Sequence, residues 1–126
     1  PGIERHRRAV ISTLQDEEGA YTFFGRPRRF PGYRSYPEKE RRAAEREAFN
    51  HTIQGTAADV VKMLMVEAKR LGLNSLWNQA HDDVCYIEPV SGIEDAEQVL
   101  LQAAANIQPF DGIELKIKPV KGEFWK

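Results

Sequence analysis

The chain has 126 residues, of which 41% are hydrophobic and 29% are charged. This length allows one ordinary domain with its own core and is too short for two. No stretch approaches the run of about 20 apolar residues that a membrane helix needs, and the composition is not that of a disordered chain. A single cysteine, Cys85, excludes an intramolecular disulfide and indicates a reducing compartment. The start of the sequence does not have the pattern of a signal peptide. Because the chain opens with Pro1-Gly2 rather than methionine, we expect it to be a piece of a longer protein.

The charges are unevenly distributed, although the formal net charge is only −1. Residues 1–46 contain eleven Lys or Arg and seven Asp or Glu, whereas residues 47–126 contain seven and twelve. A basic half followed by an acidic half fits a polyanion on one side of the protein and metal ions on the other. The same distribution also fits two differently solvated surfaces, and charge alone does not separate the two interpretations.

The first half of the chain has the pattern of helices separated by an irregular segment. A short aromatic, β-prone run occupies residues 21–24, and Pro and Gly in residues 28–36 predict an ordered loop. Gly19 is a helix stop signal before this segment. The spacing of apolar residues predicts helices over residues 3–18 and 54–71. A proline suited to a first helical turn and opposite charges four residues apart predict another helix over residues 37–50.

The second half has short strand patterns around one further helix. The β-prone runs 76–80 and 84–88 predict a hairpin with a tight turn. Ser91 and Glu94 have the spacing of a capping box, which predicts a helix after them. Strict alternation over residues 113–117 predicts an antiparallel strand with one wet face. Helices followed by a hairpin, a helix and a strand predict an α+β fold.

Residues 25–31, Gly-Arg-Pro-Arg-Arg-Phe-Pro, form an arginine cluster beside aromatic side chains. The guanidinium fork pairs with phosphate oxygens and stacks on bases, so Arg26, Arg28 and Arg29 are candidate nucleic-acid ligands. A solvated basic loop accounts for the same composition.

Arg46, Asn50 and Gln54 lie four residues apart in a segment predicted to be helical. If the helix is continuous, their side chains share one face and donate hydrogen bonds in a row. The minor groove presents acceptors that every correct base pair shares, so such a row can check pair shape without reading sequence. A polar outer face of a helix also explains the spacing.

Residues 79–84, Gln-Ala-His-Asp-Asp-Val, place two adjacent carboxylates at the predicted hairpin tip. Oxygen ligands suit Mg²⁺, which commonly takes one or two carboxylates and completes its shell with water and phosphate oxygens. Asp82 and Asp83 are therefore candidate metal and catalytic residues, although aspartate also simply favours turns. Cys85 and the three histidines lack the spacing of a zinc finger.

Three segments occur together in a specific order along the chain. Residues 25–28 read Gly-Arg-Pro-Arg, residues 54–59 read Gln-Gly-Thr-Ala-Ala-Asp after Glu45-Arg46 and Asn50, and residues 81–83 read His-Asp-Asp. In combination they resemble the C-terminal part of a family A DNA polymerase, of the bacterial polymerase I and phage type. The third segment resembles the family's His-Asp-Glu motif. The resemblance covers nearly the whole chain.

The resemblance implies a metal role for the acidic tip. Asp82 would match the palm aspartate that holds the catalytic Mg²⁺ ions, two in the intact enzyme, and Asp83 would be a nearby auxiliary carboxylate. Asp83 is one methylene shorter than the family's usual glutamate. His81 would lie against the primer end.

The resemblance also implies a DNA-binding role for the helical segment. Arg46, Asn50 and Gln54 would touch primer-template DNA around the minor groove, in agreement with their spacing. Thr52 stands where many members of the family have proline, so the bend between the two helices is expected to differ.

These observations predict an incomplete polymerase domain. Residues 1–73 would be a helical, fingers-derived part, and residues 74–126 would belong to the antiparallel palm sheet. The other palm aspartate motif and the fingers helix that grips the incoming deoxynucleoside triphosphate are absent from the sequence, so we expect the chain to be inactive alone. The alternative is a non-catalytic primer-template DNA-binding module. The expected location is the cytoplasm of a bacterial or phage-infected cell.

The resembled fold also predicts self-association. In that fold the hairpin belongs to a larger palm sheet, so an uncovered sheet edge near Val84, Tyr86 and Ile87 would recruit a second copy of the chain.

Overall fold

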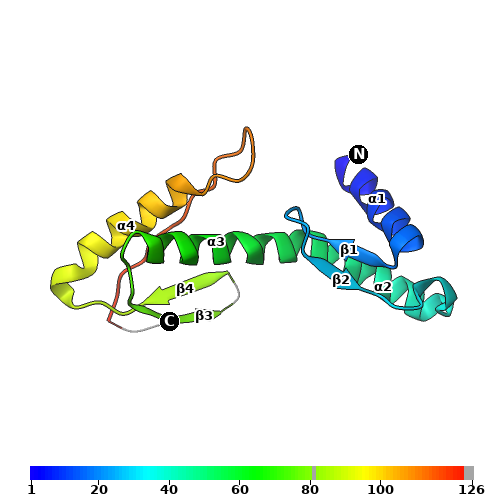
Figure 1. The fold of residues 1–126 in the computed structure, drawn as a ribbon, viewed down its shortest axis with the longest axis horizontal. Helices are drawn as coiled ribbons and strands as arrows, with labels where there is room; N and C mark the ends of the chain where they lie inside the picture. The colour runs from blue at the N-terminus through cyan, green and yellow to red at the C-terminus, as the bar shows by residue number, and fades with distance from the viewer. Residues whose placement is uncertain (81, 124–126) are drawn as a thin grey trace. The chain divides into compact units, whose positions relative to one another are not determined.

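The structure is a computed structural model that describes residues 1–80 and 82–123. It divides into two compact units, Pro1–Asp59 and Val60–Lys126. Helices and two antiparallel hairpins make up the fold (Figure 1), which confirms the predicted α+β class. No described helix has the length and apolar character needed to cross a membrane.

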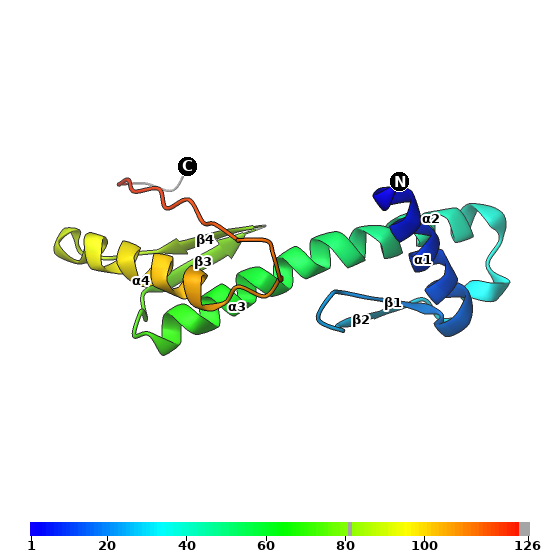
Figure 2. The ribbon, with the colours of Figure 1, turned by 90° about the horizontal axis from the view of Figure 1, so that it is seen from above.

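The first unit consists of helices and one small hairpin (Figures 1 and 2). Its elements are α1 (Gly2–Glu17), β1 (Gly19–Tyr21), β2 (Pro27–Arg29), a 3-10 turn (Tyr33–Ser35), α2 (Glu38–Asn50), a π-helical turn (His51–Gly55) and the start of α3 (Thr56–Arg70). Both α1 and β1 contact α2.

Helix α1 ends one residue earlier than predicted because Glu18, not Gly19, takes the left-handed conformation, with φ 52° and ψ 41°. The N–H of Glu18 donates to the carbonyl of Leu14. The guanidinium of Arg34 donates from Nε to the carbonyl of Gln15 at 2.6 Å and from Nη2 to that of Asp16 at 2.7 Å. This side chain therefore satisfies two of the carbonyls that a helix end leaves without partners.

The β1–β2 hairpin was not predicted from the sequence. Residues 28–36 were predicted to form a loop, but β2 pairs antiparallel with β1, with Ala20 opposite Arg28. The predicted β-prone run 21–24 is mostly the turn, where Gly25 has φ 86°. The turn closes through the N–H of Thr22 on the carbonyl of Arg26 and the N–H of Gly25 on the carbonyl of Thr22. Pro27 is compatible with β2 because this two-stranded sheet has only edge strands.

The core of the first unit joins α1, the hairpin and α2. Its buried residues are Val10, Leu14, Ala20, Phe30, Tyr33, Ala44 and Ala48. Tyr33 is 1% exposed, and its hydroxyl donates to Glu45 Oε1 at 2.8 Å. Burial, and then the hydrogen bond to the Glu45 carboxylate, raise the pKa of Tyr33 to about 12.

The second unit contains the rest of α3, β3 (Leu76–Ala80), β4 (Asp83–Tyr86), a 3-10 turn (Val90–Gly92) and α4 (Ile93–Asn106). The β3–β4 hairpin and α4 both lie beside α3 (Figures 1 and 2). Ala68, Leu73, Ala96 and Ala103 form the buried centre of this unit, with Tyr86 of β4 packed against it.

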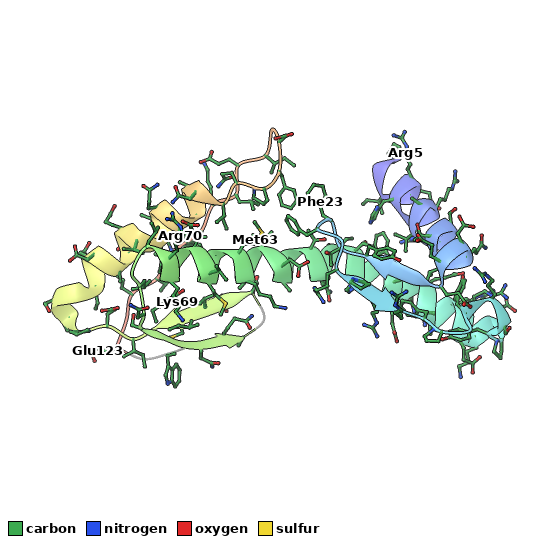
Figure 3. All side chains as sticks on the ribbon, in the orientation of Figure 1. Arg5, Phe23, Met63, Lys69, Arg70 and Glu123 are labelled. Carbon is green, nitrogen blue, oxygen red and sulfur yellow. The ribbon has the colours of Figure 1, made fainter. Side chains whose placement is uncertain are left out.

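Helix α3 follows the predicted third helix closely, from Thr56 instead of residue 54 because the π turn occupies His51–Gly55. Its last turn contains Lys69 and Arg70 (Figure 3), whose charges complement the carbonyl end of the helix. Gly72 then takes φ 99°, a left-handed conformation just past the end of the helix.

The predicted second hairpin is confirmed, with two differences. Strand β4 starts at Asp83, opposite Ala80, and ends at Tyr86 rather than at residue 88. A register shift between Leu76 and Asn78 interrupts β3. Past the end of β4, Ile87 still donates its N–H to the carbonyl of Ser75.

The capping-box prediction was wrong. Ser91 lies inside the 3-10 turn, which closes through the N–H of Gly92 on the carbonyl of Pro89 at 2.8 Å. The backbone cap of α4 is therefore Gly92, and no side-chain cap is present. Ser91 therefore lies one residue before the cap position, and its hydroxyl does not cap α4.

The predicted strand over residues 113–117 is also not formed, and no strand is assigned within residues 107–123. Instead, the side-chain amide of Gln108 contacts one residue of this segment, Leu115. Nε2 of Gln108 donates to the carbonyl of Leu115 at 2.9 Å, and the N–H of Leu115 donates to Gln108 Oε1 at 2.7 Å. Further along, Lys121 Nζ pairs with Glu94 at 3.0 Å and with Glu97 at 2.8 Å on α4.

Replacing Tyr33 with phenylalanine should reduce the pH dependence of stability in alkaline solution. The unfolded tyrosine ionises near pH 10, whereas folded Tyr33 keeps its proton to about pH 12. The stabilisation linked to this proton is therefore complete below pH 10 and is lost as the pH rises towards 12. We expect the wild type to lose about 1 kcal/mol more than Y33F between pH 9 and pH 11, with further loss above that pH. Urea unfolding at pH 9, 10 and 11 measures the difference, and parallel pH profiles would contradict the role given to Tyr33.

Candidate nucleic-acid interface

The three arginines of the cluster lie in and beside β2 but have different surroundings. Arg26 Nε pairs with Asp59 Oδ1 at 2.8 Å, and its Nη2 donates to the carbonyl of Gly55 at 3.2 Å. Arg28 Nη2 pairs with Glu47 Oε2 at 2.8 Å, whereas Arg29 is exposed opposite Gly19. Arg26 thus joins the hairpin to the helical segment, and Arg28 and Arg29 present charge at the surface.

The hairpin turn contacts the π turn at Gly55, which is buried. A Cβ at this residue would lie 2.9 Å from Thr22 Cγ2, 3.0 Å from His51 Nδ1 and 3.2 Å from Arg26 Nη2. These distances are shorter than ordinary contacts to a Cβ, so only glycine permits this approach. The Gly in the Gln-Gly-Thr-Ala-Ala-Asp run therefore has a packing role.

Two further hydrogen bonds join the same two segments. The N–H of Phe23, in the hairpin turn (Figure 3), donates to Thr56 Oγ1 at 2.9 Å. The hydroxyl of Thr56 in turn donates to the carbonyl of Thr52 at 2.5 Å. A ring nitrogen of His51 lies 3.1 Å from the carbonyl of Arg26. Together with Asp59, the Thr in the same run therefore positions the hairpin.

A polar cavity of about 370 Å³ opens beside this junction. Its lining comes from β2, α2 and the π turn, and consists of Arg28, Glu47, Asn50, His51, Gln54 and Gly55. Two members of the predicted row, Asn50 and Gln54, thus face one cavity together with Arg28. Arg46 is exposed on α2 and is not part of this lining.

The sequence did not single out Glu47 and His51 as cavity residues. One signal was present, because Glu47 precedes His51 by four residues and Asn50 by three, so all three share a helix face. The position of Arg28 required the hairpin, which was not predicted.

Thr52 lies within the π turn, where the backbone stays helical. Its hydroxyl donates to the carbonyl of Phe49 at 2.7 Å and lies 2.8 Å from His6 Nε2 on α1. Since this oxygen donates to Phe49, the histidine nitrogen is the donor in the second contact. A threonine therefore connects the π turn to α1.

The acidic tip belongs to the second unit. Asp82 is in the turn and Asp83 begins β4, and both are exposed. His81, the other residue of this motif, lies outside the described residues. Within residues 1–80 and 82–123, no three His, Cys, Asp or Glu side chains come together as a metal site. Two adjacent carboxylates nevertheless fit the one or two that Mg²⁺ commonly takes alongside water and phosphate oxygens.

The comparisons with known proteins all match DNA polymerases. The family model for DNA polymerase family A matches residues 1–126. The chain is 37% identical over 108 residues to the thermostable DNA polymerase I of Thermus filiformis, a match covering 82% of this chain and 13% of that protein. It is 33% identical over 130 residues to DNA polymerase I of Chloroflexus aurantiacus, covering 99% of this chain and 14% of that protein. The chain thus spans only a small part of the length of these relatives.

A solved structure gives the same relationship in three dimensions. The polymerase domain of Pol1 from M. smegmatis, in complex with DNA primer-template and dNTP, matches with a TM-score of 0.73 and 32% identity. The match covers 83% of this chain and 19% of that chain.

Replacing Gly55 with alanine should destabilise the protein. At an ordinary helical position the change would stabilise by roughly 0.5–1 kcal/mol. Here the new methyl group would overlap Thr22 and His51, so we expect a loss of about 1–3 kcal/mol in the free energy of unfolding. Urea unfolding measures it, with Gly2→Ala as the matched control because a Cβ at Gly2 meets nothing within 4 Å. A G55A variant as stable as G2A would show that the hairpin does not pack against this residue as described.

Proposed function

Because the chain belongs to DNA polymerase family A, we propose that it is part of a DNA-templated DNA polymerase that adds deoxynucleotides to a primer. Residues 1–73 supply a fingers-derived part with DNA-contacting helices, and residues 74–126 supply a part of the palm. The observation that carries this proposal is the convergence of Arg28, Asn50 and Gln54 on one cavity. The M. smegmatis neighbour, whose complex contains primer-template DNA and dNTP, supports both substrates.

The cavity suits the minor groove of a primer-template duplex. Side-chain amides donate hydrogen bonds to the acceptors that all base pairs present there, and a guanidinium pairs with phosphate oxygens. Asn50 and Gln54 then contact base edges, while Arg28 and the exposed Arg29 contact phosphates. Arg46 extends the contact along α2, and Arg26 contributes mainly by holding the hairpin in place. His81 is proposed to lie against the primer end.

The acidic tip is proposed to serve the chemical step. Polymerases of this family use Mg²⁺, and bound metal ions stabilise the attacking and leaving oxygens of an in-line displacement. Asp82 would hold the metal, and Asp83 would act as an auxiliary carboxylate with a shorter reach than glutamate. One strand pair offers too few carboxylates for two ions, so the 126-residue chain is proposed to be inactive alone. The uncovered edge of the β3–β4 sheet is proposed to recruit a second copy of the chain.

In the complete polymerase that carries this chain, Asp82→Ala should lower primer extension by about 100-fold or more, because a metal ligand is lost. DNA affinity should change little, since the contacts around Arg28 belong to the other unit. Single-turnover extension and DNA titration measure the two effects, and Asp111→Ala, which changes another exposed aspartate, is the control. Near-normal extension by D82A would show that the metal role given to Asp82 is wrong. Mg²⁺-dependent extension by the 126-residue chain would refute its inactivity.

DNA binding by the 126-residue chain should be weak and strongly salt-dependent. Arg26, Arg28 and Arg29 neutralise at most three phosphates, so the slope of log affinity against log salt should be between about −2 and −3. The sequence of the duplex should matter little, because the amides donate to acceptors common to all pairs. Anisotropy titrations of a primer-template duplex test both points, with light scattering at the same concentrations to report self-association. Tight binding that is insensitive to salt would contradict this interface.

A further inference from the structure

Glu47 places a carboxylate inside the cavity that is proposed to meet DNA. Its side chain is about half exposed, and Oε2 lies 2.8 Å from Arg28 Nη2. It is the only acidic residue among those that line this cavity. A negative charge at a surface that binds phosphates opposes DNA binding, so Glu47 is unexpected in this cavity.

The Arg28 guanidinium does not depend on Glu47 alone for its position. Its Cζ lies 5.5 Å from the centroid of the Phe30 ring, and Phe30 is buried in the core of the first unit. Stacking on a fixed aromatic ring restrains the arginine from a second direction. Neutralising Glu47 would therefore leave Arg28 in the cavity with its charge uncompensated.

Glu47 and a DNA phosphate compete for the same partner. Both are anions that accept charge-assisted hydrogen bonds from a guanidinium. Because the pair is half exposed, the ion pair is weak enough for a phosphate to displace it. Before DNA binds, however, Arg28 adds no net charge to the cavity, and the electrostatic attraction for DNA is reduced accordingly.

We propose that Glu47 neutralises Arg28 in the free protein and competes with DNA phosphate for the Arg28 guanidinium. This competition lowers the affinity of the surface for DNA. This inference rests on the proposed function. A polymerase must move along its template after each addition, and a contact that an internal carboxylate can replace is released more readily than one without a substitute. Glu47 thus acts through Arg28 as a positioning residue.

The test measures salt-dependent binding of a fluorescent primer-template duplex by the 126-residue chain and by Glu47→Gln. The substitution keeps the shape and removes the charge. We expect E47Q to bind about fivefold more tightly at low ionic strength, the effect of one unit charge at about 4 Å in water. The gain should shrink as the salt concentration rises, because salt screens the attraction of the uncompensated charge for DNA. Thermal unfolding confirms that E47Q is folded.

Glu38→Gln is the matched control, because Glu38 forms an exposed ion pair with Arg42 on the same helix and does not line the cavity. E38Q should change affinity and its salt dependence by less than E47Q. A second comparison places E47Q in an Arg28→Gln background, where the gain in affinity should be clearly smaller than in the wild type because the partner has been removed.

The outcomes separate the two levels of the proposal. If the wild type shows no DNA binding at any salt concentration, the proposed function fails, and this inference fails with it. If the wild type binds but E47Q matches it or E38Q, the competition is refuted and the proposed function stands. Equal gains from E47Q with and without Arg28 would also refute it, because Glu47 would then act on DNA directly.

Discussion

The first unit depends on the close approach of a hairpin turn to a helical backbone at Gly55. Without a Cβ at this residue, Thr22 and Arg26 reach the π turn, and Asp59 and Thr56 hold them there through an ion pair and a hydrogen bond. The consequence extends beyond packing, because the β1–β2 hairpin carries Arg28 to the cavity lined by Asn50 and Gln54. The arginine cluster and the amide row, which are separate in the sequence, thus become one surface.

The sequence predicted the helices well, because their apolar spacing also determines their burial. Leu14 and Ala68 are completely buried on the faces that periodicity assigns to the interior. The β1–β2 hairpin could not be predicted in the same way. Its strands have three residues each and β2 is exposed throughout, while Arg26 bonds to Asp59 and Gly55, which are more than 25 positions away. Such long-range contacts leave no periodic signal.

In the candidate site, too, local sequence patterns were predictive and contacts between distant residues were not. The motif residues were identified from the sequence, but the neighbours that give each its role were not. Arg26 and Arg28 look equivalent in the chain, yet one is bound internally to Asp59 and the other faces the cavity beside Glu47. The π turn was also not foreseen, because the sequence indicates a break between two helices near residues 51–53 but nothing in it specifies a π turn. The capping box failed because a 3-10 turn, a three-residue event, displaced the start of α4.

The side-chain amide of Gln108 positions the backbone of the last segment at Leu115. Its oxygen accepts from Leu115 and its nitrogen donates to Leu115 and to the carbonyl of Ala104, so one side chain stands in for a neighbouring strand over one residue. Glutamate would lose both donated bonds, and asparagine is too short to span the same gap. The alternation of residues 113–117 therefore does not produce a strand here, and the backbone at Leu115 is bonded by an amide that lies outside the alternating segment.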